Sequence, residues 1–118
     1  MDEFNLSTVR DCPVTATMSI IGGKWKILIL YLIFNDINRF GKMSMTLKDI
    51  SKQMLTTQLR ELEQDGIIER KIFAEIPPHV EYFLTEKGRS LLPIIEIMKD
   101  WGNKYVLKVV QDEIVVNL

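Results

Sequence analysis

The chain has 118 residues, of which 47% are apolar, so it can form one domain whose core needs no disulfide or metal. Fifteen basic residues against sixteen acidic ones exclude the overall positive charge that marks many nucleic-acid-binding proteins. The single cysteine excludes an internal disulfide, no secretory signal pattern opens the chain, and the longest apolar run, residues 27–34, is too short to span a membrane. We therefore expect a cytoplasmic protein with no membrane role.

The first half of the chain predicts a flexible arm followed by three helices. Residues 1–11 show no pattern and form the arm, and a proline suits the first turn of a helix over residues 13–21. Two glycines interrupt the pattern, and residues 24–34 form a second helix, favoured over a strand by their length. After a turn at residues 35–38, apolar residues at helical spacing within residues 39–47 predict a third, short helix.

The next helix begins at Ser51, whose hydroxyl can cap its first turn, and ends before Gly66. Its apolar stripe consists of Leu55, Leu59 and Leu62. Its opposite face is polar and carries Gln53, Thr57 and Arg60, with Thr56 at the side and Lys52 towards the boundary of the core.

The last part of the chain predicts a β-hairpin and a long helix. Side chains alternate on both sides of Pro77 and Pro78, first at Ile68, Arg70, Ile72, Ala74 and Ile76 and then at Val80, Tyr82 and Leu84. Thr85 can cap a long final helix with two apolar stripes. One stripe is Leu91, Ile94, Met98, Trp101 and Tyr105, and the other is Leu92, Ile95, Val106 and Val109. A small domain covers only one stripe, which predicts a dimer; residues 111–118 form a tail without a clear pattern.

Two helices joined by a tight connection, the second with an outward polar face, are typical of a protein that reads the major groove of DNA. Residues 39–71 hold seven basic and five acidic side chains, a local positive excess in a chain that is negative overall. The hairpin that follows would be a wing, with His79 at its tip in contact with solvent or phosphate. On the pattern alone, a polar helix face that merely contacts water explains these residues equally well.

A series of short strings in fixed order resembles the HxlR type of bacterial winged-helix regulators, which are related to the MarR group. The resemblance covers residues 12–102 and includes Cys12-Pro-Val, Ile21-Gly-Gly-Lys-Trp25, Arg39-Phe40, Gln58-Leu59-Arg60-Glu61-Leu62-Glu63, Val80-Glu81-Tyr82 and Leu84-Thr85-Glu86-Lys87-Gly88. It departs from the family pattern at Gly41-Lys42 and over residues 44–49. The resemblance implies a mainly helical α+β fold with a small hairpin, a winged helix-turn-helix over residues 12–110. It also implies a homodimer formed through the terminal helices that binds pseudo-palindromic double-stranded DNA.

Pattern and resemblance together give the predicted site residues. The predicted DNA-binding residues are Arg39, Ser51, Lys52, Gln53, Thr56, Thr57, Arg60, Arg70, Lys71 and His79. The predicted dimer interface consists of Leu92, Ile95, Met98, Trp101 and Tyr105. Cys12 begins a helix whose dipole favours a thiolate, and the resemblance implies that it senses oxidants or electrophiles; the alternative is a small buried side chain.

Two other classes of function are weighed against DNA binding. A winged-helix module that binds only protein is the first, and the net negative charge favours it. An enzyme is the second, and we do not expect one, because the sequence has no catalytic triad, metal-ligand spacing or phosphate-binding loop. We expect no cofactor and no metal, and an effector, if the protein has one, would be an oxidant or a small molecule.

Overall fold

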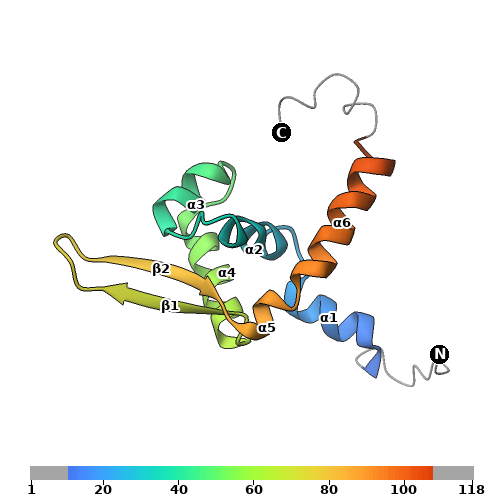
Figure 1. Cartoon of the computed structure of the whole chain (residues 1–118), viewed down its shortest axis with the longest axis horizontal. Coiled ribbons are helices and arrows are strands. Elements are labelled where there is room, and N and C mark those ends of the chain that lie inside the picture. Colours follow the sequence, from blue (N-terminus) through green and yellow to red (C-terminus); the bar gives the residue numbers. More distant parts are fainter. Residues whose placement is uncertain (1–10, 108–118) are drawn as a thin grey trace.

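The structure is a computed structural model that describes residues 11–107. It is mainly helical, with one two-stranded antiparallel hairpin that projects from the body (Figure 1). The predicted arm, apart from Asp11, and the predicted tail at residues 111–118 lie outside the described residues, as does Val109 of the second apolar stripe.

Helices α1 (Pro13–Ile21) and α2 (Lys26–Phe34) open the fold, and the glycine pair between them makes the sharp change of direction. Gly23 has a φ of 88°, a value that favours glycine, and a Cβ at Gly22 would collide with the carbonyl oxygen of Met18. The second helix therefore begins two residues later than the sequence predicted, at Lys26 rather than Lys24.

Helices α3 (Phe40–Thr46) and α4 (Lys52–Gln64) form the predicted pair joined by a short connection. Ser51 caps α4 as expected, since its Oγ accepts a hydrogen bond of 3.0 Å from the backbone N–H of Met54. Gly66, at a φ of 74°, ends α4, and the N–H of Ile67 donates to the carbonyl of Leu62. The departures from the family pattern near Gly41 do not prevent α3 from forming.

Strands β1 (Ile68–Phe73) and β2 (His79–Leu84) pair in a register that sets Ile68 against Leu84 and Phe73 against His79. The first strand is shorter than its alternating pattern suggested, because Ala74 and Ile76 lie in the connecting loop. We call the whole hairpin with its loop, residues 68–84, the wing.

The predicted final helix is two helices, α5 (Glu86–Arg89) and α6 (Leu92–Tyr105). Thr85 caps α5 rather than one long helix, because its Oγ1 accepts from the N–H of Gly88 at 3.0 Å. Pro93 lies in the first turn of α6, where its missing N–H costs no helical hydrogen bond.

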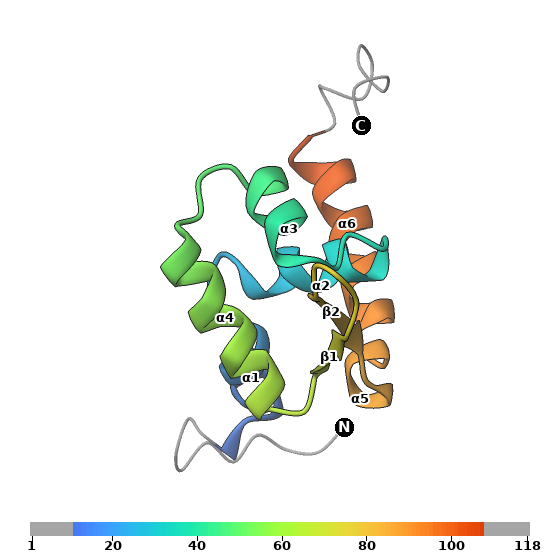
Figure 2. The same cartoon turned by 90° about the vertical axis from the view of Figure 1, so that its left-hand side faces the viewer.

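The core lies where α2, α3 and α4 meet the start of the wing. Its fully buried side chains are Ile29, Leu30, Met43, Leu55, Leu59, Leu62, Ile67 and Ile68. Helix α2 runs between α4 and α6, so α1 and α6 lie on the side away from the wing (Figures 1 and 2). The wing and α4 therefore project from one part of the molecule, and α1 and α6 from another.

Within residues 11–107 no single helix has the length and apolar composition to cross a membrane; α1 and α2 reach both only as a pair that is bent by 71°.

Candidate nucleic-acid interface

Helix α4 carries the predicted reading face on a rigid support. Its three leucines, Leu55, Leu59 and Leu62, are buried in the core, while Gln53, Thr57 and Arg60 are exposed. Thr56 lies half-buried at the side, as predicted. Lys52 does not lie at the core boundary, because its side chain is exposed. The burial pattern thus leaves one polar face of α4 accessible along its length.

The two threonines of this face have a restricted hydrogen-bonding capacity. Thr57 Oγ1 donates to the carbonyl of Gln53 at 3.0 Å, and Thr56 Oγ1 donates to the carbonyl of Lys52 at 2.9 Å. Each hydroxyl has one hydrogen, so in this arrangement it offers acceptor lone pairs and a methyl group to a ligand. The donors of the face are the amide of Gln53 and the guanidinium of Arg60, and these two groups suit adenine and guanine edges respectively.

The wing adds two cations beside α4. Arg70 Nε lies 3.9 Å from Glu63 Oε2, and Lys71 Nζ lies 3.8 Å from Glu69 Oε1. Both pairs are long and exposed, so they contribute little to stability. Each cation can therefore pair with a phosphate in place of its glutamate. Neighbouring strand positions face opposite sides of the hairpin, so Arg70 and Lys71 point to different faces of the wing.

His79 is not at the exposed tip of the wing, where the sequence analysis expected it. It is the first residue of β2, its side chain is only 19% exposed, and its ring stacks on Phe73 with the centroids 4.8 Å apart. The tip instead consists of residues 74–78, with Ile76 fully exposed.

The structure brings His79 together with Arg39, another predicted DNA-binding residue, where the outer half of the wing contacts the start of α3. Glu81 lies between them, and burial that raises its pKa is outweighed by hydrogen bonds from His79 and Arg39 and by their charges, so the pKa of Glu81 is lowered. Sequence reasoning gave Glu81 no role, although it lies in one of the strings that carry the family resemblance, Val80-Glu81-Tyr82.

A second pair that sequence reasoning missed connects α2 to α4. Lys26 Nζ lies 2.7 Å from Glu61 Oε1, and the lysine is buried while the glutamate is half exposed. This pair connects the start of α2 to the second half of α4. The sequence pattern gives no sign that Lys26 is buried, because a lysine side chain is ordinarily exposed.

The predicted dimer interface divides into two parts. Ile95, at 4% exposure, is buried in the core of its own chain, and the half-buried Leu92 packs against that core. Met98, Trp101 and Tyr105 are exposed, and the rings of Trp101 and Tyr105 contact each other at 5.4 Å.

Other exposed apolar side chains extend this face across α6, α1 and α2. They are Val14, Met18, Leu28, Ile94 and Ile97. Four of them, Val14, Met18, Leu28 and Ile94, line an open, mostly apolar groove of about 510 Å³ between α1, α2 and α6. Exposed apolar side chains gathered on one face in this way are typical of surfaces that bind another protein.

Cys12 is the N-cap residue of α1 and is half-buried. The backbone N–H groups of Thr15 and then of Val14 lower the pKa of its thiol, more than burial raises it. The sulfur therefore lies at the positive end of a helix, as the sequence analysis predicted, and it is not a fully buried packing residue. Within residues 11–107 no group of three or more His, Cys, Asp or Glu side chains could hold a metal ion.

Comparison with known proteins finds a matching family model and similar curated proteins. A family model described as HxlR-like helix-turn-helix matches residues 20–110. The chain is 48% identical over 103 residues to the Bacillus subtilis protein described as uncharacterized HTH-type transcriptional regulator YdeP, covering 87% of this chain and 80% of that one.

Two solved structures described as redox regulators or transcriptional regulators share the fold. The redox regulator HypR in its oxidized form has a TM-score of 0.75 and 47% identity, covering 79% of this chain and 96% of that chain. The reduced form of the transcriptional regulator YodB from B. subtilis has a TM-score of 0.70 and 35% identity, covering 80% and 94% respectively.

Proposed function

Since the chain belongs to the HxlR-like helix-turn-helix family of transcription regulators, we propose that it binds specific double-stranded DNA as a homodimer, with α4 in the major groove. The observation that carries the proposal is the exposed face of α4, where Gln53, Thr57 and Arg60 project from a helix fixed by three buried leucines. The wing lies next to α4 and would place Arg70 or Lys71 against the adjacent backbone.

Gel-shift titration with a duplex selected by the protein from random-sequence DNA tests this assignment. Arg60→Ala should cost about 1–3 kcal/mol of binding free energy and relax the choice of base, if Arg60 pairs with a guanine. Lys87→Ala removes one exposed positive charge from α5 and serves as the control, for which only a small change is expected. Unchanged affinity and selectivity after joint replacement of Gln53, Thr57 and Arg60 by alanine would contradict the proposal and favour a module that binds protein.

The exposed apolar face of α1 and α6 supports the homodimer. Met98, Trp101 and Tyr105 form a continuous line with Ile94 along one side of α6. A second copy of the chain related by two-fold symmetry would cover this face with the same face of its own. Such a dimer would present two copies of α4 to successive turns of a duplex.

Cys12 supports a redox or electrophile response. Its lowered pKa raises the fraction of reactive thiolate near neutral pH, and the similar HypR structure is described as that of a redox regulator. Because Cys12 is the single cysteine, the products open to it are an intersubunit disulfide, a mixed disulfide with a small thiol, or an electrophile adduct. In the first case two Cys12 thiols would give up two electrons and two protons to an oxidant such as diamide.

In this role the chain needs no catalytic activity. A bacterial transcription regulator binds chromosomal DNA, which lies in the cytoplasm, and this places the protein there.

A further inference from the structure

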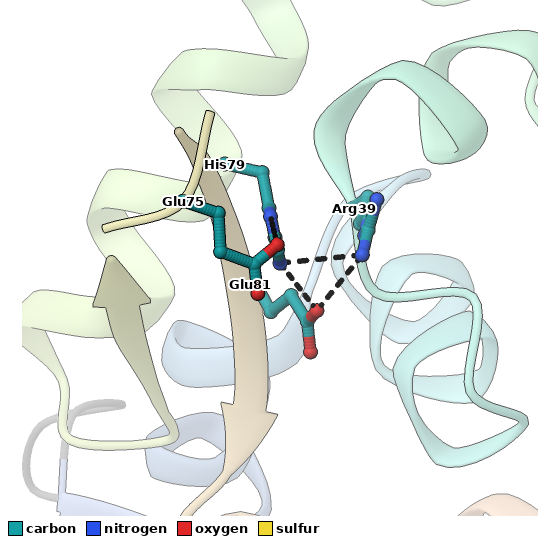
Figure 3. Close-up of polar contacts among 4 residues, drawn as sticks. All are labelled: Arg39, Glu75, His79 and Glu81. Atoms are coloured by element: carbon teal, nitrogen blue, oxygen red, sulfur yellow. Dashed lines mark hydrogen bonds and ion pairs between the residues drawn. The ribbon is translucent and has the colours of Figure 1, made fainter. Parts of the chain in front are cut away.

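Four side chains meet where the outer half of the wing contacts the start of α3: Arg39, Glu75, His79 and Glu81, here called the wing cluster (Figure 3). Glu81 is at its centre. Its Oε2 lies 2.8 Å from His79 Nε2 and 3.2 Å from Arg39 Nη2. Arg39 Nη2 is also 3.2 Å from His79 Nε2, and His79 Nδ1 lies 3.4 Å from Glu75 Oε1. Three of the four residues come from the wing, and Arg39 comes from the N-cap of α3.

Main-chain contacts hold the same two segments together. The N–H of Tyr82 donates to the carbonyl of Asn38 at 2.9 Å, and Arg39 forms an isolated antiparallel bridge with Glu81. The cluster therefore lies at a junction that the backbone already defines. The Glu81 side chain is only 21% exposed there, so its charge is satisfied by Arg39 and His79 more than by water.

Arg39 is held at one end only. Both of its side-chain contacts within residues 11–107 use Nη2, and 56% of the side chain is exposed. The guanidinium is planar and has five N–H donors, so fixing Nη2 fixes the direction in which the remaining donors point. Those donors are accessible to a phosphate oxygen that approaches the start of α3.

We propose that Glu81 is a positioning residue for DNA binding, which anchors Arg39 and orients its outer donors towards the DNA backbone while it holds the wing against α3. The inference rests on the proposed function. It predicts a change in DNA affinity opposite to the one expected from charge repulsion alone. Removing an acidic side chain from a DNA-binding surface ordinarily strengthens binding, because it removes repulsion from phosphate. Removal of Glu81 should weaken it.

The test compares Glu81→Ala with Glu69→Ala by titration of the full-length protein against the duplex selected by the wild type. Glu69 is also on the wing and half exposed, and it pairs only loosely with Lys71, so it is the matched control for loss of one negative charge. We expect Glu69→Ala to bind as tightly as the wild type or more tightly, and Glu81→Ala to bind roughly fivefold or more weakly. Circular dichroism and sedimentation establish that each variant keeps its fold and assembly.

Two further variants separate positioning from general damage. Glu81→Gln keeps an acceptor oxygen for Arg39 and should recover part of the affinity that Glu81→Ala loses, while remaining weaker than the wild type. In the Arg39→Ala background, Glu81→Ala should cause little further loss, since the anchored group is absent.

Tighter binding by Glu81→Ala or Glu81→Gln, as in the Glu69 control, would overturn the inference. The inference would also be overturned if the fold losses of DNA affinity caused by Arg39→Ala and by Glu81→Ala multiplied in the double variant. If the wild type itself selects no duplex, the proposed function fails, and that outcome is distinct from a failure of the inference.

Discussion

The thiol of Cys12 is the residue whose environment makes the clearest pH prediction. Its folded-state pKa is lowered by the backbone N–H groups of Thr15 and Val14, so the thiolate is more abundant in the folded protein than in the unfolded chain at the same pH. In a profile of alkylation rate against pH, the rise should therefore occur at a lower pH for the folded protein than for the chain unfolded by urea. By linkage, this group adds stability as the pH rises above its folded pKa. Superimposed rate profiles for the two states would contradict the prediction.

The Ser51 side chain makes a prediction about stability. Its Oγ accepts the N–H of Met54, a hydrogen bond that alanine cannot make, so Ser51→Ala should lower the free energy of unfolding by about 1 kcal/mol. Ser44→Ala in α3 is the control, because Ser44 caps no helix. Urea denaturation measures both. Equal effects of the two substitutions would show that the cap contributes nothing specific.

Residues whose role depends on neighbours in the chain were predictable, and residues whose role depends on distant segments were not. Ser51 and Gly66 act within one turn of α4, so their types and spacing suffice to assign them. His79 was placed at the tip because the family resemblance implied a wing around Pro77 to His79. Its actual position depends on Arg39, forty residues away, and on Glu81, and no local pattern carries that information.

Among the elements, α2 and α4 depend on the ion pair of Lys26 and Glu61. Glu61→Ala would leave a buried ammonium group without its 2.7 Å partner, and we expect a loss of about 1–3 kcal/mol in the free energy of unfolding. Lys26→Met removes the charge and keeps an apolar chain of similar length, so it should be much less destabilising. Denaturant titrations of both variants test the order, and a larger loss for Lys26→Met would contradict it.

The boundaries of elements followed from the sequence where capping residues or glycines mark them, as for α1 and α4. The boundary between α5 and α6 did not follow from the sequence, because a proline can either interrupt a helix or lie in the first turn of a new one. A continuous helix from Glu86 would set the Pro93 ring against the carbonyl of Arg89, and the chain avoids this by ending α5 and beginning α6 at Leu92. On α6, Ile94, Met98, Trp101 and Tyr105 of the first predicted stripe are exposed, whereas Ile95 of the second stripe is buried in the core.

At the scale of the whole molecule, the exposed face of α1 and α6 predicts a dimer. Ile97 on α6 is 68% exposed and Ile72 on the wing is 69% exposed, so they form a matched pair. Ile97→Asp should place a charge in the dimer interface and shift the protein towards monomer, while Ile72→Asp should leave assembly unchanged. Sedimentation velocity at micromolar concentration distinguishes them. A wild-type monomer, or equal effects of the two substitutions, would contradict this interface.

The distribution of charge explains how a chain with a net charge of −1 can bind DNA. Arg39, Lys52, Arg60, Arg70 and Lys71 are exposed and belong to α4, the wing or the start of α3. With affinity dependent on a few local cations, binding should weaken steeply as salt rises, because each phosphate contact releases counterions. Gel shifts at several salt concentrations give the slope, and a slope near zero would contradict phosphate contacts.

The most direct test of the central claim, that a dimer reads DNA through two copies of α4, is hydroxyl-radical footprinting on the selected duplex. We expect two protected segments on one face of the duplex with their centres about 10–10.5 base pairs apart, or a whole multiple of that spacing. The joint alanine variant of Gln53, Thr57 and Arg60 should lose both segments together. A single protected segment, or protection that persists in that variant, would contradict the claim.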